Sequence, residues 1–384
     1  MRVLHLVKTT RGAAWALRQI AALRALGVEV TVALPSRADG LAPEYARAGA
    51  TVVEADLDFF PGPRLAASLH RCRALVERVQ PDLIHSHFVG TTLVARLALG
   101  RAHPVPRVFQ VPGPLHLEHA ITRRLELATA GPRDHWIGTC RWTEQVYLRL
   151  GVPRERVFLS YYGTVFAPPS DRRDHVRLEL GVDSNTPLVG MVAYVYAPRR
   201  VFAQRRGIKG HEDFVEAVHR LGGLGVRAAV VGGAWTGADA YERRLRAYAR
   251  RRCGAAIRFT GHRTDVPDVY AALDVAVHPS LSENCGAAVE SLAAACPTVA
   301  TRVGGLPDVV IDGETGWLVP PRSPARLAEA IGAALADPAG ARRCARSGQA
   351  LVRRLFAIER TAAEIAEIYQ TILRVPRHEL RVAV

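Results

Sequence analysis

A short basic stretch, Arg205–Glu212 (RRGIKGHE), places Lys209 between Gly207 and Gly210, directly before a helical pattern. The N-terminus of a helix offers free N–H groups and the positive end of its dipole, which favour phosphate. A lysine adds a compact charge, whereas an arginine adds a planar fork. Of 51 basic side chains, only Lys8 and Lys209 are lysines. On this local pattern alone, a phosphate site and a solvated basic turn are equally good interpretations.

Two carboxylates follow in the segment 278–291 (HPSLSENCGAAVES). Glu283 lies in a loop after a predicted strand, and Glu290 lies one helical turn after Gly286, so it can point back toward that loop. Carboxylate oxygens accept hydrogen bonds from hydroxyls, which suits a polyhydroxylated ligand. The alternative is a surface glutamate in a helix. The apolar residues around Glu290 argue against that alternative, since glutamate is rarely buried without partners.

A glycine pair, Gly304 and Gly305, follows the predicted strand Thr298–Thr301. Glycine lets a backbone approach a ligand closely, although two glycines also make ordinary turns.

The surrounding pattern predicts an α/β protein with two parallel sheets. Short apolar runs alternate with helical patterns from residue 3 to 160 and again from 188 to 319. A proline- and charge-rich stretch, 166–187, separates the two sets and indicates a linker. We therefore expect doubly wound domains at 1–165 and 188–368. In such sheets ligands bind beyond the carboxyl ends of the strands, so the two domains should face a central cleft.

Composition excludes several classes of protein. The net charge is +15, but it divides evenly, +8 over residues 1–165 and +7 over the rest. Nucleic-acid binding is not expected, because such proteins concentrate basic charge on one face. The six cysteines show no metal-binding spacing, and no signal or membrane-spanning segment is apparent. These features predict a cytoplasmic protein. Peripheral membrane contact is not indicated but is left open, as is the oligomeric state.

Taken in order, the motifs resemble those of the family 4 retaining glycosyltransferases along essentially the whole chain. The first part shows the opening run 3–35 and PDLIHSHF at 81–88. The second part shows, in order, KG at 209–210, GH at 261–262, Asp274 with HPS at 278–280, the two glutamates, GG at 304–305 with Asp308, and DG at 312–313 with TG at 315–316. The resemblance implies a GT-B fold, namely two Rossmann-like domains, with the acceptor bound mostly by the first and a nucleotide-sugar donor mostly by the second. It also implies that the chain after about Tyr369 (369–384) returns to the first domain.

The resemblance also implies roles for particular residues. Lys209 and a nearby arginine bind the diphosphate, Glu290 holds the ribose diol, and Glu283 contacts the donor sugar. The expected catalytic set is Glu283, Arg206 and Lys209. The expected donor-binding set is Glu290, Asn284, Cys285, Gly286, Ala287, Gly304, Gly305, Arg205, His262 and Arg263. The acceptor-side candidates are Lys8, Thr9, Arg11, Gly12, His87 and His116.

Three departures from the family pattern leave alternatives open. Six residues rather than seven separate the two glutamates, so the first role falls to Glu283 or, in a gap-free register, to Ser282. An insertion before Lys209 leaves Arg200, Arg205 and Arg206 as candidates for the phosphate arginine, with Arg206 favoured. Finally, His116 lies four residues after the place where the family often has a histidine, and a structural role is as plausible for it.

The sequence thus predicts a hexosyltransferase that retains anomeric configuration and needs no metal or other cofactor. Its substrates would be a nucleoside-diphosphate sugar, UDP by family frequency, and a hydroxyl of a sugar, aminocyclitol or other small acceptor in bacterial natural-product or cell-surface polysaccharide biosynthesis. A GT-B epimerase or phosphorylase is the closer alternative. An NAD-dependent dehydrogenase is remote, because G-x-G-x-x-G is missing after the first strand.

Overall fold

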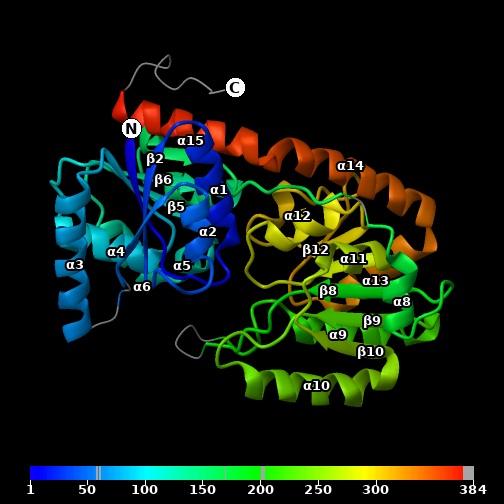
Figure 1. The fold of residues 1–384 in the computed structure, drawn as a ribbon. Coiled ribbons are helices and arrows are strands. Elements are labelled where there is room, and N and C mark those ends of the chain that lie inside the picture. The colour runs from blue at the N-terminus through cyan, green and yellow to red at the C-terminus, as the bar shows by residue number, and fades with distance from the viewer. Residues whose placement is uncertain (58, 60–61, 169, 200–203, 375–384) are drawn as a thin grey trace. The chain divides into compact units, whose positions relative to one another are not determined.

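The computed structural model describes residues 1–57, 59, 62–168, 170–199 and 204–374. The chain forms two compact units (Figure 1): Met1–Val165 together with the segment from Leu355 onward, and Phe166–Arg354.

The first unit is built on one parallel sheet. Within the described residues it has seven strands in the order β3-β2-β1-β4-β5-β6-β7, in which the order reverses between β1 and β4. The strands are β1 Arg2–Leu6, β2 Glu29–Leu34, β3 Thr51–Glu54, β4 Leu83–Ser86, β5 Arg107–Val111, β6 Asp134–Gly138 and β7 Val157–Leu159. The helices are α1 Ala14–Ala25, α2 Ala42–Arg47, α3 Pro63–Val79, α4 Val89–Leu99, α5 Leu115–Glu118, α6 Ala120–Ala128, α7 Arg141–Arg149 and α15 Ile358–Leu373.

Helices cover both faces of the first sheet. Side chains of successive strand residues point to opposite sides, so each face presents its own set of apolar side chains. Val3 belongs to a cluster with Ile20 of α1, whereas Leu4 belongs to a cluster with Leu75 of α3. Strands buried on both faces read as continuous apolar runs, as the chain does here.

The C-terminal helix α15 belongs to the first unit. Ile365 and Tyr369 pack in the same cluster as Ile20 of α1, and this apolar stripe drives the helix onto the sheet. The expected return of the chain at residue 369 is therefore placed too late, because the segment from Leu355 already belongs to this unit. The tail 375–384 lies outside the described residues.

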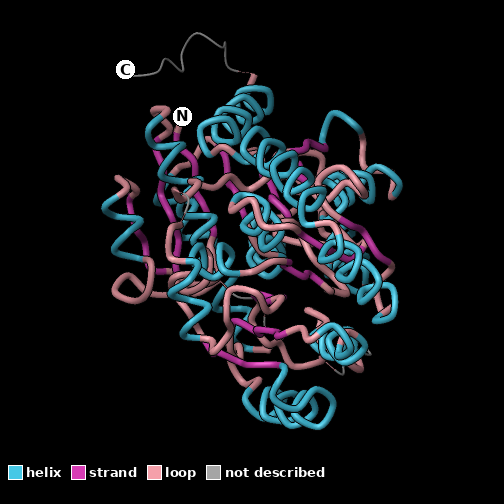
Figure 2. Tube along the Cα trace, turned by 90° about the vertical axis from the view of Figure 1, so that its right-hand side faces the viewer, coloured by secondary structure: helices cyan, strands magenta, loops and turns pink. Residues whose placement is uncertain are grey.

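The second unit repeats the same architecture, and in Figure 2 the strands of each sheet lie among helices. Its sheet has six parallel strands in its described part, in the order β10-β9-β8-β11-β12-β13. The strands are β8 Leu188–Val192, β9 Arg227–Val231, β10 Ile257–Gly261, β11 Val275–His278, β12 Thr298–Thr301 and β13 Trp317–Val319. The helices are α8 Arg173–Glu179, α9 His211–Arg220, α10 Asp239–Cys253, α11 Val266–Ala272, α12 Gly286–Ala293, α13 Pro324–Ala336 and α14 Pro338–Phe356.

The stretch 166–187 is not a free linker. It contains helix α8, whose Val176 packs with Leu180, Val182 and Tyr270 in a core cluster of the second unit. The guanidinium of Arg177 is buried and donates to the carbonyl oxygen of Ala272 at 2.9 Å. The proline- and charge-rich composition concealed an apolar contact surface, and the expected linker belongs to the second unit.

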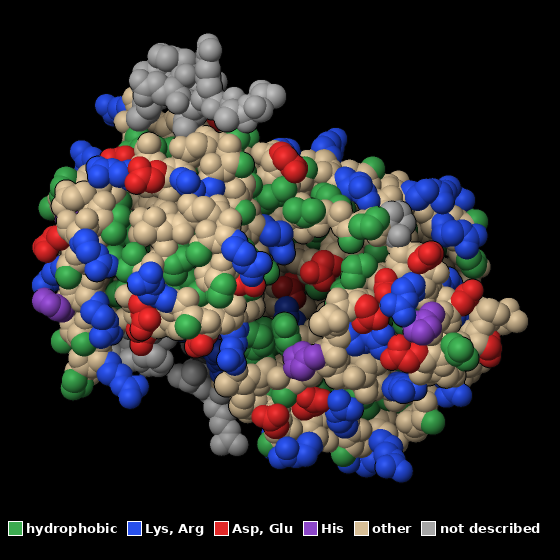
Figure 3. Space-filling model, viewed as in Figure 1, with side chains coloured by type: hydrophobic (Ala, Val, Ile, Leu, Met, Phe, Trp, Pro, Cys, Tyr) green, Lys and Arg blue, Asp and Glu red, His purple; other side chains and the backbone are tan. Residues whose placement is uncertain are grey.

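Surface charge is mixed. On the face shown in Figure 3, Lys and Arg side chains are scattered among Asp and Glu. Among the described helices, none combines the length and the apolar character needed to cross a membrane.

Candidate functional site

The centre of the candidate site lies at the carboxyl ends of β8 and β11, where the order of the second sheet reverses. Ligands of doubly wound sheets bind at this switch point. Lys209 comes from the connection after β8 and Glu283 from the loop after β11. The Nζ of Lys209 donates a hydrogen bond to Oε2 of Glu283, and the two side chains are only 18% and 12% exposed.

The backbone holds these two segments together. The N–H of Leu281 donates to the carbonyl oxygen of Ile208 at 2.7 Å. Gly210 has a left-handed φ of 71°, and a Cβ there would lie 1.9 Å from the carbonyl oxygen of Pro279. Only glycine fits such a close approach. The sequence KG therefore positions the lysine, because its glycine lets the turn pack against the HPS loop.

The carboxylate of Glu283 is held by its own loop. Ser280 Oγ donates to Oε2 and the N–H of Asn284 donates to Oε1, each at 3.1 Å. The glycine pair joins the same site, since the N–H of Gly305 donates to the carbonyl oxygen of Glu283 at 3.2 Å. Cys285 is buried with its thiol 3.2 Å from the Gly305 carbonyl. The structure thus brings the Glu283 loop and the Gly304–Gly305 loop together.

The electrostatics favour a charged Lys209. Burial alone would lower the pKa of its ammonium group, but the Glu283 carboxylate, with contributions from Tyr196 and Glu290, holds that pKa above the ordinary value. Glu290 itself is exposed on α12, so the expectation that apolar neighbours bury it is wrong. Those neighbours, Ala288 and Val289, pack inward, and Glu290 occupies the opposite side of the helix. It still lies within electrostatic reach of Lys209.

The candidate phosphate arginines differ in environment. Arg206 is paired with Asp213 of α9 and keeps 49% of its side chain exposed. Arg205 is exposed in the same turn. Arg200 lies outside the described residues.

The helix α12 begins at Gly286, and a Cβ at this position would meet no atom within 4 Å. The space beside Gly286 is therefore open at the start of the helix, the end at which N–H groups favour anions. Ala287 is half-buried, and its carbonyl accepts a hydrogen bond from Tyr270 at 3.2 Å.

Two other residues that were expected to bind the donor, His262 and Arg263, lie in different environments. His262 is exposed after β10, and its ring lies against Gly233. Arg263 points into an ion-pair network instead, with Glu179 at 2.5 Å and Asp265 at 2.5 Å. These two carboxylates engage the guanidinium, and the assignment of the Arg263 side chain to the donor stays a prediction.

In the first unit, the acceptor-side candidates after β1 form a turn at the switch point of that sheet. The Oγ1 of Thr9 accepts a hydrogen bond from the N–H of Arg11 at 3.0 Å, and Gly12 follows with φ 73°. Lys8 and Arg11 are exposed, which suits a binding loop.

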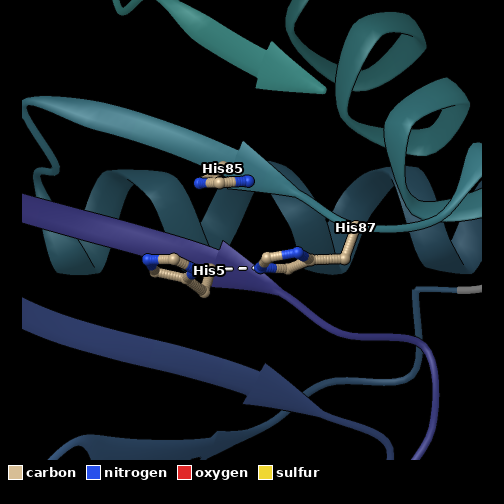
Figure 4. Close-up of side chains that lie close together, drawn as sticks. All are labelled: His5, His85 and His87. Carbon is tan, nitrogen blue, oxygen red and sulfur yellow. Dashed lines mark hydrogen bonds between the residues drawn. The ribbon is translucent and has the colours of Figure 1, made fainter. Parts of the chain in front are cut away.

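His87 belongs to a buried histidine trio with His5 and His85, which come from β1 and β4 (Figure 4). His5 Nδ1 and His87 Nε2 share a hydrogen bond of 2.9 Å. Two tyrosines complete the network: His87 Nδ1 bonds to Tyr162 OH at 3.0 Å, and His85 Nδ1 bonds to Tyr369 OH. Burial holds the pKa values of all three imidazoles well below the usual range, that of His5 at about 3.

Among the described residues, the trio has the spacing of a possible metal site, because its potential ligand atoms all lie within 4.8 Å of one another. Neutral imidazoles are the form that binds metals. In this structure, however, the nitrogens of His5 and His87 bond to each other and to tyrosines. His87 is therefore buried in a network in which its ring nitrogens bond to His5 and Tyr162.

His116 is also a structural histidine. It is buried on α5, its Nε2 bonds to Tyr147 OH at 3.0 Å, and its ring packs on Phe109. Burial lowers the pKa of His116 to about 4. Of the two roles left open for His116, the structural one fits this placement, because the ring is buried against Phe109.

Sequence reasoning missed several residues around Lys209. Ser280 orients Glu283, and Tyr196 packs beside the ammonium group of Lys209. The signal for Tyr196 was present in the alternating YVY at 194–196, directly after the strand.

Comparison with known proteins assigns the chain to a class. The family described as Glycosyltransferase Family 4 matches residues 12–164, and Glycosyl transferases group 1 matches residues 198–337. The chain belongs to the family 4 glycosyltransferases of GT-B fold, as expected from its motifs.

Particular relatives are similar over most of the chain. A D-inositol 3-phosphate glycosyltransferase of Xylanimonas cellulosilytica is 35% identical over 348 residues, which cover 82% of this chain and 78% of the relative. A lipopolysaccharide core biosynthesis mannosyltransferase of Rhizobium meliloti is 31% identical, with 59% and 63% covered. The structure of HepE of Anabaena in complex with UDP has a TM-score of 0.78 at 24% identity, covering 96% of this chain and 99% of that one. The same protein was solved with UDP-glucose, at a TM-score of 0.78 and 22% identity, covering 96% and 98%.

Proposed function

We propose that this glycosyltransferase moves a hexose from a nucleoside-diphosphate sugar, UDP-sugar by preference, to a hydroxyl of a small acceptor, with retention and without a metal. The observation that carries the proposal is the Lys209–Glu283 pair at the switch point of the second sheet. It sets a cation for a diphosphate beside a carboxylate for sugar hydroxyls, and the open start of α12 lies in the same loop.

The chemistry follows from the charge that develops as the diphosphate leaves. Fixed donors aimed at the phosphate oxygens supply the largest catalytic effect. Lys209, Arg206 and the N–H groups at the start of α12 and at Gly304 serve this role. The acceptor hydroxyl attacks the anomeric carbon on the face that the phosphate leaves, and a phosphate oxygen takes the proton. Glu283 positions the sugar and is not the nucleophile.

Support for UDP comes from the UDP and UDP-glucose complexes of HepE. Support for a small hydroxylated acceptor comes from the name of one relative, D-inositol 3-phosphate glycosyltransferase, because that name contains a phosphorylated polyol. An aminocyclitol or a sugar at the end of a bacterial natural product or polysaccharide presents the same kind of hydroxyl. The solvent-facing turn 8–12 in the first unit is the proposed acceptor side.

The test has two stages. Thermal-shift measurements with UDP, GDP and ADP and with their glucose and mannose conjugates identify the donor, and UDP compounds should raise the unfolding temperature most. NMR of the product formed from the selected α-linked donor should then show an α-linkage, with turnover unaffected by EDTA. A β-linked product, or release of a sugar phosphate, would overturn the proposal.

A further inference from the structure

Four rings form a connected cluster at the carboxyl ends of β8, β9 and β10, which we call the aromatic wall: Tyr194, Tyr196, Trp235 and His262. Tyr194 lies at the centre of the wall. Its ring centroid is 4.9 Å from that of Trp235, 5.3 Å from that of His262 and 6.4 Å from that of Tyr196. Tyr194 is 40% exposed, and His262 is also exposed. Large aromatic side chains in mutual contact at an exposed strand end are the exception on a protein surface and mark binding sites.

The backbone fixes the wall in place. Beyond β8 the chain stays extended, with the N–H of Val195 bonded to the Gly233 carbonyl and the N–H of Trp235 bonded to the Val195 carbonyl, each at 2.9 Å. Side chains alternate along an extended segment, so the buried Val195 turns inward and the flanking tyrosines turn to the other side. His262 packs on the bare backbone of Gly233, where a Cβ would lie 3.0 Å from Nε2.

The aromatic wall is continuous with the phosphate side of the candidate site. The Nζ of Lys209 lies 6.0 Å from the centroid of the Tyr196 ring, and Tyr196 lies 5.9 Å from Trp235. Burial raises the pKa of the Tyr196 hydroxyl, against the influence of Lys209, so this ring stays neutral. A path of rings therefore runs from the cation to the exposed face of Tyr194.

We propose that the aromatic wall stacks the nucleobase of the donor, with Trp235 and Tyr194 as its principal contacts. The proposal rests on the function above, because it takes Lys209 to hold the diphosphate. A nucleotide is a planar aromatic base joined to a phosphate group, and the wall and Lys209 present the matching surfaces side by side. Stacking on aromatic side chains accepts any base, since every base has a π face. The wall therefore contributes affinity for the base, whereas selection among bases requires hydrogen bonds elsewhere.

The test compares a ligand that has a base with one that has none. Dissociation constants for UDP, and for inorganic pyrophosphate in competition with UDP, are measured by calorimetry for the full chain. Trp235→Ala should weaken UDP by about 5- to 150-fold, the range for loss of one stacked base. It should leave pyrophosphate unchanged, and Trp235→Phe should retain most of the affinity. Equal weakening of both ligands, or an unchanged UDP affinity, would overturn the proposal.

A second variant covers the case in which Trp235→Ala does not fold. Tyr194→Ala removes an exposed ring and should weaken UDP but not pyrophosphate. Quenching of tryptophan fluorescence on UDP addition should disappear in Trp235→Phe, and quenching that persists counts against the wall.

Lys209→Ala separates this inference from the proposed function. It should weaken UDP and pyrophosphate alike. If it weakens both while the Trp235 and Tyr194 variants weaken neither, the aromatic wall fails and the phosphate site stands. If Lys209→Ala weakens neither, the proposed phosphate site fails.

Discussion

Lys209 and Glu283 form a salt bridge across the switch point of the second sheet, although they lie 74 positions apart in the chain. The pair sets the protonation of the site before a ligand arrives, because the carboxylate keeps the ammonium charged. Lys209→Ala removes the cation and leaves Glu283 unopposed. We expect turnover to fall by about 10²- to 10³-fold, the cost of losing one electrostatic donor at a transition state.

Steady-state kinetics with the identified donor checks this expectation, and circular dichroism should show an unchanged fold. Lys209→Arg is the matched control. It keeps the charge but replaces a compact group by a planar fork, so partial activity is expected. Turnover of Lys209→Ala near that of the unaltered enzyme would remove Lys209 from the catalytic set.

Gly210 positions this lysine by its lack of a side chain. Gly210→Ala should both destabilise the second unit and impair donor binding, because the new Cβ would clash with the carbonyl oxygen of Pro279. Urea unfolding and UDP affinity measure the two effects. Gly237→Ala is the control, since Gly237 also has a positive φ of 78° but no atom within 4 Å of a Cβ. The control should cost about 1–2 kcal/mol, the penalty of a left-handed alanine, and leave UDP affinity unchanged.

Most of the fold could be predicted from the sequence because parallel sheets buried on both faces leave continuous apolar runs. The strand β3 Thr51–Glu54 shows the limit of this signal, because it is an edge strand whose residues are all half-buried or exposed and it has no such run. The linker was misjudged for a related reason. Arg177 is charged, yet backbone carbonyls at Ala272 and Thr186 surround its guanidinium, and composition does not reveal such partners.

The candidate site was predictable where motif and backbone geometry coincide, as at Gly210. It was not predictable where a side chain has two possible orientations. The sequence does not say which of two residues of α12, Glu290 or Ala288, faces the core of the second unit. It also gives no sign that Glu179 and Asp265 bind Arg263. These outcomes depend on contacts between residues far apart in the chain.

Glu290 and Lys8 provide a test of which unit binds the donor. If Glu290 holds the ribose diol, Glu290→Ala should raise the donor KM by about 10-fold or more, the loss of hydrogen bonds to a charged group. Lys8→Ala should raise the donor KM less, because Lys8 belongs to the first unit. Initial-rate kinetics at saturating acceptor measures both values. The reverse order would move the donor to the first unit.

A buried charge network stabilises the first unit. Arg96 donates to Glu126 at 2.6 Å and to Asp134 at 3.0 Å, and the three side chains are at most 1% exposed. Glu126→Ala leaves a buried guanidinium short of a partner and should cost about 3–5 kcal/mol in urea unfolding. Glu44→Ala, which removes the more exposed pair with Arg47, should cost less than about 1 kcal/mol. Equal costs for the two variants would contradict this account.

The histidine trio predicts a pH dependence of stability. The folded pKa values of His5, His85 and His87 lie well below the ordinary 6.5, because burial disfavours the charged form. Because these imidazoles have a lower pKa in the folded than in the unfolded protein, they favour the fold fully above pH 6.5, where they are neutral in both states. This contribution to stability is lost as the pH falls from 6.5 toward the folded pKa, since only the unfolded protein then takes up the proton. Each buried neutral imidazole should contribute a slope of about 1.4 kcal/mol per pH unit below that point.

The effect of the trio can be isolated from that of other buried histidines by comparing slopes. His87→Asn should reduce the slope of unfolding free energy between pH 6 and pH 4.5, since one fewer proton is taken up on unfolding. His70→Asn, at an exposed position on α3, is the control and should leave the slope unchanged. Urea unfolding at successive pH values, followed by circular dichroism, measures both. If His87→Asn keeps the full slope, His87 is already protonated in the folded protein, and the neutral network with His5 and Tyr162 is wrong.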